Sequence, residues 1–427
     1  MTASEQLAQF AAGSKALPKL CREYKKERAT VHLKELVGGA LSFYAAAAVA
    51  KTGGVHIFVA EDRDAAAYLL NDFYNLLDEK QVYFFPSSYK RSAAYGAEDA
   101  QGVVQRTTAM NAVRGFTKGY LVVCTYPEAL AERVVDAATL QRDTIAVKLG
   151  DKISIAVLED ALADANFTRV DFVYEPGQYS VRGGIVDVFS YSESKPYRID
   201  FFGDEVDSIR RFNISSQLSA DKLDRVEIVP NLNAGEAPRV SFVQFAGSSA
   251  TCWFYDADYV LRRVNDLRRK VLADMEEPGQ IDRLLTSRNV LLRDMAGNSV
   301  VALRDNLPER PATAAVVFDT APQPKFNKNF EMLADDMIRN SLRGYATYIL
   351  SENKVQVERL ENIFHQIGRG QAAVRSLSVT LHEGFVDNDL KLCLYTDHQI
   401  FDRYQRYRIN GEIRRDEQMT VAELNQL

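Results

Sequence analysis

The chain has 427 residues, of which 46% are hydrophobic and 26% are charged, and its formal net charge is -6. This length and hydrophobic share are enough for about three domains with cores of their own, and they exclude a largely disordered chain. The negative charge disfavours a protein whose main task is to coat nucleic-acid backbones, because that affinity comes from lysine and arginine side chains that displace counterions.

The sequence shows no membrane segment, secretion signal or metal-binding motif. No run of eighteen apolar residues occurs, and the start MTASEQLAQFAAGSK lacks the basic and apolar regions of a signal peptide. The cysteines lie more than a hundred residues apart and have no histidine partner at ligand spacing. We therefore expect a cytoplasmic protein with free thiols, no metal ion and no membrane contact. The cysteines are Cys21, Cys124, Cys252 and Cys393.

The first 125 residues alternate short apolar runs with amphipathic segments. An N-terminal helical stretch ends near Lys26. The runs that follow predict, in order, a strand at 55–60, a helix at 64–78, a strand at 82–85, a helix at 99–114 and a strand at 120–124. Such alternation is typical of right-handed crossovers and of a parallel sheet covered on both faces.

The pattern changes near Thr125 to short, alternating strands joined by tight turns. The most informative stretch, 174–212, has turn signals at Pro176-Gly177 and Gly203-Asp204. Successive side chains of a strand point to opposite faces. Tyr197, Ile199 and Phe201 therefore share a core face, and the opposite face carries Arg198, Asp200 and Phe202. The mixed composition of this second face suits a protein-binding surface.

Mixed strands and helices return from Asn213 to about Thr320. They include a strand at 225–230 and a charged helix at 259–275. After a linker with Pro322 and Pro324, a last α/β unit follows, with a strand at 345–350, a helix at 354–366 and a strand at 391–395. This unit has its own alternation, so we expect it to have its own core.

The runs PGQYSVRGGIVDVF and YRIDFFGDEVDSIRRFN resemble the second domain of the bacterial transcription-repair coupling factor (Mfd) family, a segment that is closely similar in the excision-repair protein UvrB. Weaker resemblance to the coupling factor family runs along the whole chain. It implies an α/β protein with a degenerate RecA- or helicase-like domain 1 at 1–125 and 213–320, an inserted α+β domain 2 at 126–212, and a separate small α/β domain 3 at 321–427.

In the resembling family the inserted domain docks UvrA. Carried over residue by residue, the resemblance implies UvrA-binding roles for Arg169, Arg182, Asp187, Phe189 and Arg198. An arginine offers a planar fork of donors that can hold a partner carboxylate. Residues 126–212 contain ten basic and sixteen acidic side chains, so these arginines are better suited to a protein partner than to nucleic acid.

The alternative role for these arginines is internal. They could instead form ion pairs within the domain with Asp171, Asp200 or Asp207.

The turn at 36–43 stands just before an expected helix, where a Walker A loop would lie. A Walker A loop needs glycines, a lysine for the phosphate charge and a Ser or Thr hydroxyl for magnesium. Compared with the UvrB-like loop, Gly38 and Gly39 are followed by Ala40 in a glycine position, Leu41 in the lysine position and Ser42 in the hydroxyl position. Glu35 falls where the first glycine belongs.

The substitutions in this loop lead us to expect no catalysis and no cofactor in this chain, so that it acts as an adaptor. The alternative is an ATP-dependent DNA-remodelling repair enzyme of the UvrB type.

The sequence ends in an expected helix start. Thr420 to Glu423 form a capping box only a few residues before Leu427, which suggests a longer protein. The resemblance implies that the full-length family protein is a DNA translocase ATPase with RNA polymerase and double-stranded DNA as further partners. A third hypothesis is that this part of the protein holds the translocase in check.

Overall fold

The computed structural model describes residues 2–89, 99–232, 237–275, 277–405, 407–409 and 412–413. A seven-stranded, wholly parallel sheet forms the centre of the first unit. From one edge to the other its strands are β17 (Ala314–Val317), β1 (Thr30–Lys34), β16 (Ser299–Ala302), β15 (Thr251–Phe254), β2 (Gly54–Val59), β4 (Tyr120–Thr125) and β3 (Val82–Phe84). The sheet contains strands from before and after the inserted domain, and the expected α/β class with a parallel-sheet domain and an inserted domain is confirmed.

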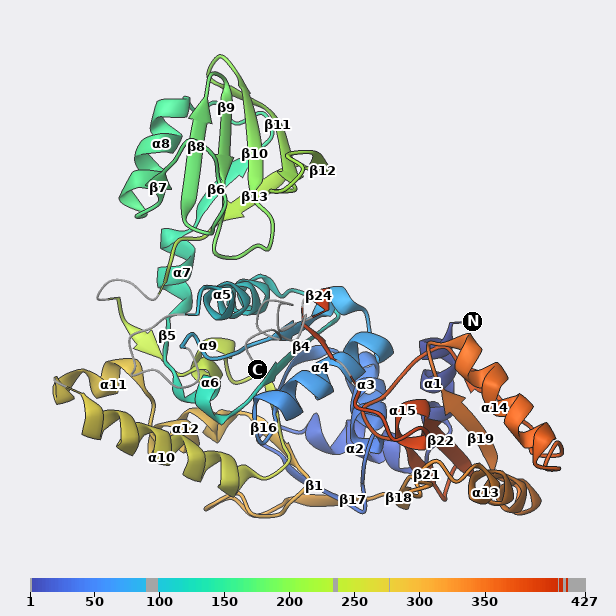
Figure 1. The fold of residues 1–427 in the computed structure, drawn as a ribbon. Helices are drawn as coiled ribbons and strands as arrows, with labels where there is room; N and C mark the ends of the chain where they lie inside the picture. The colour runs from blue at the N-terminus through green and yellow to red at the C-terminus, as the bar shows by residue number, and fades with distance from the viewer. Residues whose placement is uncertain are drawn as a thin grey trace, which may run out of the picture.

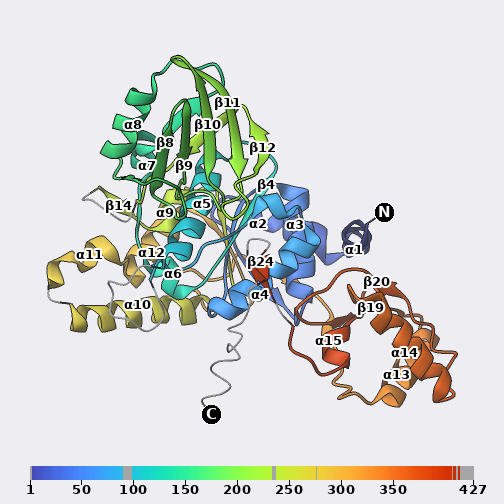
Figure 2. The ribbon, with the colours of Figure 1, turned by 45° about the horizontal axis from the view of Figure 1, so that its top comes forward.

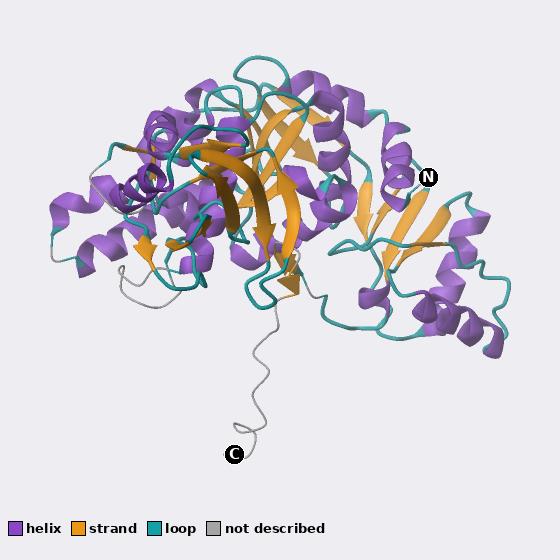
Figure 3. Cartoon of the chain, turned by 90° about the horizontal axis from the view of Figure 1, so that it is seen from above, coloured by secondary structure: helices purple, strands orange, loops and turns teal. Residues whose placement is uncertain are grey.

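Helices lie on both sides of this sheet (Figures 1 and 3). The helices of this unit are α1 (Ala3–Ala12), α2 (Ala16–Tyr24), α3 (Ala40–Thr52), α4 (Arg63–Leu76), α5 (Ala100–Gly115), α6 (Pro127–Ala131), α7 (Ala137–Asp143), α9 (Phe242–Ala246), α10 (Ala257–Asp274), α11 (Ile281–Leu284) and α12 (Arg288–Asp294). Their starts follow local capping chemistry. Asp62, for example, accepts a 2.8 Å hydrogen bond from the amide of Ala65 at the start of α4. A short pair, β5 (Val134–Val135) and β14 (Arg239–Val240), lies beside this body.

The inserted domain projects from the first unit (Figure 1) and presents a broad sheet (Figure 2). The chain enters through β6 (Ile145–Lys148) and leaves through β13 (Arg225–Ile228), which pair antiparallel. Between them, α8 (Ile155–Asp164) packs on a six-stranded sheet. Its strands, in spatial order, are β12 (Ser219–Leu223), β11 (Glu205–Phe212), β10 (Tyr197–Phe202), β9 (Ile185–Val188), β8 (Gln178–Arg182) and β7 (Thr168–Arg169).

In the structure the inserted domain begins at Ile145 and ends at Ile228, whereas the expected bounds were 126 and 212. Tyr126, Leu130 and Val135 belong to the core of the first unit, because α6 and β5 pack on that unit. At the other end, β12 and β13 continue the inserted domain beyond Phe212, and Val226 and Ile228 complete its core.

The third unit has a five-stranded sheet. Its order is β18 (Thr320–Pro322), β21 (Phe385–Asp387), β22 (Leu392–Thr396), β19 (Ala346–Leu350) and β20 (Ser376–Leu377). The helices are α13 (Phe330–Leu342), α14 (Lys354–Gln366) and α15 (Asp397–Ile400). The unit has a core of its own around Phe326, Leu360 and Tyr395. However, Leu381 and Phe385 belong to the core of the first unit, so the two units share a packed boundary.

The last described elements of the chain are the paired strands β23 (Arg408–Ile409) and β24 (Glu412–Ile413). The capping box expected at Thr420 to Glu423 lies outside the described residues. Among the described helices, every one is too short or too polar to cross a bilayer.

Candidate functional site

The outer face of the inserted sheet is the face turned away from α8. Tyr197 and Ile199 on β10 are buried with Leu158 and Leu162 of α8, whereas Phe202 is 83% exposed. This agrees with the alternation read from the sequence. A bulge between Asp200 and Phe201 locally changes the register with β11.

Arg182, Asp187 and Arg198 form a compact ion-pair cluster on this outer face. Asp187 on β9 lies directly opposite Arg198 on β10. Arg198 donates through Nε to Asp187 Oδ1 at 2.7 Å and through Nη2 to Oδ2 at 2.8 Å, and Arg182 Nη2 donates to the same Oδ2 at 2.5 Å. The side chain of Asp187 is only 2% exposed, so two arginines satisfy one buried carboxylate.

The two arginines of this cluster differ in their access to solvent. The side chain of Arg198 is 14% exposed and that of Arg182 is 37% exposed. Hydrogen bonds to Asp187 raise the pKa of the Arg198 guanidinium above its ordinary value. Arg198 is therefore held in place inside the cluster, while Arg182 faces outward.

Aromatic rings support both guanidinium groups. Arg182 lies over Phe172 with its Cζ 4.8 Å from the ring centroid, and Arg198 lies over Phe212 at 4.4 Å. Phe212 is fully buried, but Phe172 is 47% exposed. Leu218, next to the Gln217 that accepts from Arg198, is 70% exposed. The outer face thus combines outward-facing charge with exposed apolar side chains, a composition typical of docking surfaces.

The other two residues that the resemblance assigned to docking lie elsewhere. Arg169 on β7 is paired with Glu159 of α8 at 2.5 Å, on the helix side of the sheet. Phe189 is 5% exposed and has no free surface to offer a partner. The structure therefore brings together three of the five residues: Arg182, Asp187 and Arg198.

Phe202 was not among the residues assigned by the resemblance. It ends β10 at the turn to β11, and the amide of the preceding Phe201 donates to the carbonyl oxygen of Gly184 at 2.8 Å. This contact places the β10–β11 turn beside the turn that follows Arg182. The period-2 alternation already put Phe202 on the outer face, and its position at a turn is the signal that marks it as exposed.

The degenerate phosphate loop lies at the carboxyl end of β1. Glu35 and Gly38 have φ values of 58° and 57°, a left-handed conformation that favours glycine. Ser42 in the first turn of α3 donates to Asp72 Oδ2 at 2.6 Å and to the Gly39 carbonyl at 3.1 Å. Burial raises the pKa of Asp72 to about 7.

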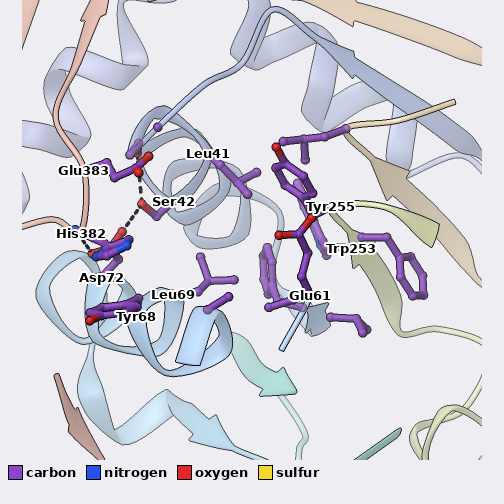
Figure 4. A pocket seen from close by; sticks show the side chains of 18 residues that line it. Leu41, Ser42, Glu61, Tyr68, Leu69, Asp72, Trp253, Tyr255, His382 and Glu383 are labelled. Atoms are coloured by element: carbon purple, nitrogen blue, oxygen red, sulfur yellow. Dashed lines mark hydrogen bonds between the residues drawn. The ribbon is translucent and has the colours of Figure 1, made fainter. Parts of the chain in front are cut away.

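A cavity of about 300 Å³ opens beside this loop (Figure 4). It lies between the ends of the neighbouring strands β2 and β15. After β2 the chain forms β3 at one edge of the sheet, whereas after β15 it forms β16, which lies towards the other edge. This is the point at which open α/β sheets usually bind ligands. Its walls include Leu41, Tyr68 and Trp253, and no lysine or arginine lines it among the described residues.

Metal chemistry and thiol chemistry find little support in the described residues. Within the described ranges, no group of three or more His, Cys, Asp or Glu side chains could hold a metal ion. The four cysteines are free and buried. Burial raises the pKa of Cys252 to about 12 and that of Cys393 to about 11, which disfavours the reactive thiolate.

Comparison with known proteins gives two concordant findings. The model of the UvrB interaction domain family matches residues 145–233, which coincide with the inserted domain from β6 to just beyond β13. The chain is also similar to the transcription-repair-coupling factors of Bacillus subtilis (strain 168) and Escherichia coli (strain K12), each 27% identical over 199 residues, or 46% of this chain and 17% of the relative. The factor of Haemophilus influenzae is 35% identical over 101 residues, 24% of this chain and 9% of the relative.

These matched segments cover less than a fifth of each relative. The resemblance read from the sequence is nevertheless confirmed as a similarity: residues 145–233 match the model of the UvrB interaction domain family, and up to 46% of the chain is similar to transcription-repair-coupling factors.

Proposed function

We propose that this chain is a non-catalytic adaptor in transcription-coupled nucleotide excision repair, whose inserted domain recruits UvrA to stalled RNA polymerase. The observation that carries the proposal is the outer face of the inserted sheet, where a partly exposed Arg182 and an exposed Phe202 lie beside a buried, fully paired Asp187. The similarity to a UvrB interaction domain and to transcription-repair-coupling factors supports it.

The residues of this face have different parts in the proposed docking. Arg182 offers further guanidinium donors to a carboxylate of UvrA, and Phe202 offers apolar area. Asp187 and Arg198 are mostly buried and fix the orientation of Arg182. Phe189 acts on the stability of the domain because it is buried, and Arg169 lies on the helix side of the sheet, where its exposed ion pair with Glu159 contributes little stability.

Further parts of the proposal come from the family resemblance. The chain works without a bound cofactor, in the cytoplasm, and without membrane contact. Within a full-length protein of this family it accompanies a DNA translocase ATPase that engages RNA polymerase and double-stranded DNA. The acidic balance of the inserted domain supports a protein partner for that domain in place of nucleic acid.

Binding of purified UvrA to variants of the chain tests the docking face. Arg182→Ala and Phe202→Ala should each weaken binding about thirtyfold, equivalent to about 2 kcal/mol, because central anchors of an interface carry most of its affinity. Arg169→Ala is the matched control, since it removes an ion-paired arginine from the opposite side of the same sheet. Equal losses in the control and in Arg182→Ala would contradict the proposal.

One observation favours the alternative of an ATP-dependent enzyme of the UvrB type: the loop before α3 keeps a glycine-like backbone at Glu35. A titration of the natural chain with Mg²⁺ and ATP separates the two. Saturable binding that Ser42→Ala abolishes would favour the enzyme, whereas UvrA binding in the absence of ATP favours the adaptor.

The third hypothesis is that this part of the protein restrains the translocase. An unchanged ATPase rate after deletion of this part from a full-length protein would contradict it.

A further inference from the structure

The third unit packs directly on the two glycines of the degenerate phosphate loop. A Cβ atom at Gly39 would overlap the carbonyl oxygen of Glu383, and one at Gly38 would lie 3.0 Å from the carbonyl oxygen of Gly384. Backbone can approach backbone this closely only where a side chain is lacking. Both glycines therefore serve the packing of a polypeptide segment, residues 382–384.

Hydrogen bonds from α4 hold this segment in place. Asp72 accepts from the amide of His382 at 2.6 Å with one carboxylate oxygen and from Ser42 Oγ at 2.6 Å with the other. Asn75 Nδ2 donates to the Thr380 carbonyl at 2.9 Å, and the His382 ring stacks on Tyr68 with centroids 3.7 Å apart. The hydroxyl that a Walker A loop offers to magnesium is thus already engaged at the boundary between the units (Figure 4).

The third unit also holds the other end of the loop. Thr320, the first residue of β18, donates through Oγ1 to the Glu35 carbonyl at 2.7 Å and accepts from the amide of Val37 at 3.1 Å. A phosphate-binding loop works by turning free backbone N–H groups towards the anion. At Val37 that group is already satisfied by the third unit.

Two features therefore oppose nucleotide binding at this loop: the missing lysine and the packed segment 382–384. The loop keeps its left-handed backbone at Glu35 and Gly38, so its shape is not what excludes a phosphate. The segment 382–384 adds the bulk of its backbone, and the Glu383 carboxylate lies 3.4 Å from the Cβ position of Gly38. A carboxylate beside the loop repels a phosphate bound there.

We propose that the third unit has a function of its own. Residues 382–384 occupy the place beside Gly38 and Gly39 where the phosphates of a nucleotide would bind, and they thereby keep nucleoside triphosphates out of the first unit. This function is independent of docking to UvrA. The cavity beside Leu41, Tyr68 and Trp253 then remains open only to molecules without a triphosphate.

The test restores the loop with and without withdrawal of the segment, in the whole chain. A loop variant combines Glu35→Gly, Ala40→Gly and Leu41→Lys. A second protein adds Gly384→Val, whose side chain would overlap Gln323 Oε1 and meet the Leu394 carbonyl, both in the third unit. We expect this overlap to shift the segment, while the loop sequence stays the same as in the loop variant.

Binding of Mg²⁺–ATP is measured by calorimetry. The loop variant alone should bind ATP no better than the natural chain, and adding Gly384→Val should tighten binding at least tenfold. Gly370→Val is the control, because it crowds the His365 ring in the same unit, away from the loop, and should leave ATP binding unchanged.

Hydrogen exchange in the same samples reports whether residues 380–384 are released while the strand amides of 54–59 and 120–125 stay protected. Where the substitution leaves the segment protected, deletion of His382 and Glu383 removes it outright. Tight ATP binding by the loop variant with the segment still protected overturns the proposal. Failure of ATP to bind after the segment is released overturns it as well.

Discussion

At the scale of residues, the shared carboxylate of Asp187 determines how the outer face is built. It is the most buried member of the cluster, and both arginines donate to it. A buried ion pair adds little net stability when complete, but loss of one partner leaves an unpaired charge and is costly. The cluster therefore fixes geometry more than it contributes stability.

Asp187→Ala should destabilise the inserted domain by about 3 kcal/mol, because it leaves the largely buried Arg198 without its carboxylate. Urea unfolding followed by far-UV circular dichroism measures the change. Asp200→Ala is the comparison, since the Asp200–Arg210 pair is more exposed and should contribute less than about 1 kcal/mol. Similar losses at both positions would show that burial does not set the cost.

At the scale of elements, the boundary between α3 and the segment 382–384 depends on absent side chains. Gly39 has a φ of -65°, which any residue can adopt, so a substitution there tests contact and not backbone strain. Among the residues that the structure describes, an added methyl would overlap severely with the Glu383 carbonyl alone.

Gly39→Ala should lower the unfolding free energy by about 1–3 kcal/mol, the usual cost of overpacking. Gly115→Ala serves as its control, because nothing lies within 4 Å of a Cβ at that helix end. That change should be neutral or slightly stabilising. Thermal unfolding measures the stability of the two variants. If Gly39→Ala left the stability unchanged, the boundary between α3 and the segment 382–384 could shift freely.

Elements with strong local periodicity were predictable from the sequence. The helix expected at 354–366 is α14 (Lys354–Gln366), and the strand expected at 120–124 is β4. Strand β1 was not predicted, although TVHLK alternates polar and apolar residues over five positions and thus has the pattern of a half-buried strand. On the outer face of the inserted sheet, alternation placed Arg198 and Phe202 correctly, but it could not reveal that Arg182 and Arg198 share one partner.

What the sequence could not show are contacts between distant segments. The pairing of β6 with β13 spans the whole inserted domain, and for that reason the expected borders at 126 and 212 differ from the observed ones. The packing of 382–384 on Gly39 likewise has no local signal, since a double glycine is equally compatible with a simple turn.

At the scale of the whole molecule, the two units that meet at Asp72 should respond to pH. Burial raises the pKa of Asp72 to about 7, above its ordinary value of 3.8. The folded chain therefore retains a proton that the unfolded chain releases near pH 4. The contribution of this group is full below that pH and is lost as pH rises towards 7, by at most about 1.4 kcal/mol for each pH unit.

Asp72→Asn should remove this part of the pH dependence. Between pH 5 and pH 7 the stability of the natural chain should fall relative to that of the variant, as measured by the melting temperature of each. Burial lowers the pKa of the neighbouring His382, which acts in the opposite direction, but the comparison cancels it because both proteins contain it. Parallel curves for the two proteins would contradict a raised Asp72 pKa.

The inserted domain joins the first unit through two adjacent antiparallel strands, with Ile145 opposite Ile228. Opposed residues in such a pair lie only about 5 Å apart. The host chain thus meets both ends of the insertion at nearly one point, so a two-residue turn could replace residues 145–228 without stretching the parallel sheet. The inserted domain can therefore be exchanged for another domain, while its host keeps the same scaffold.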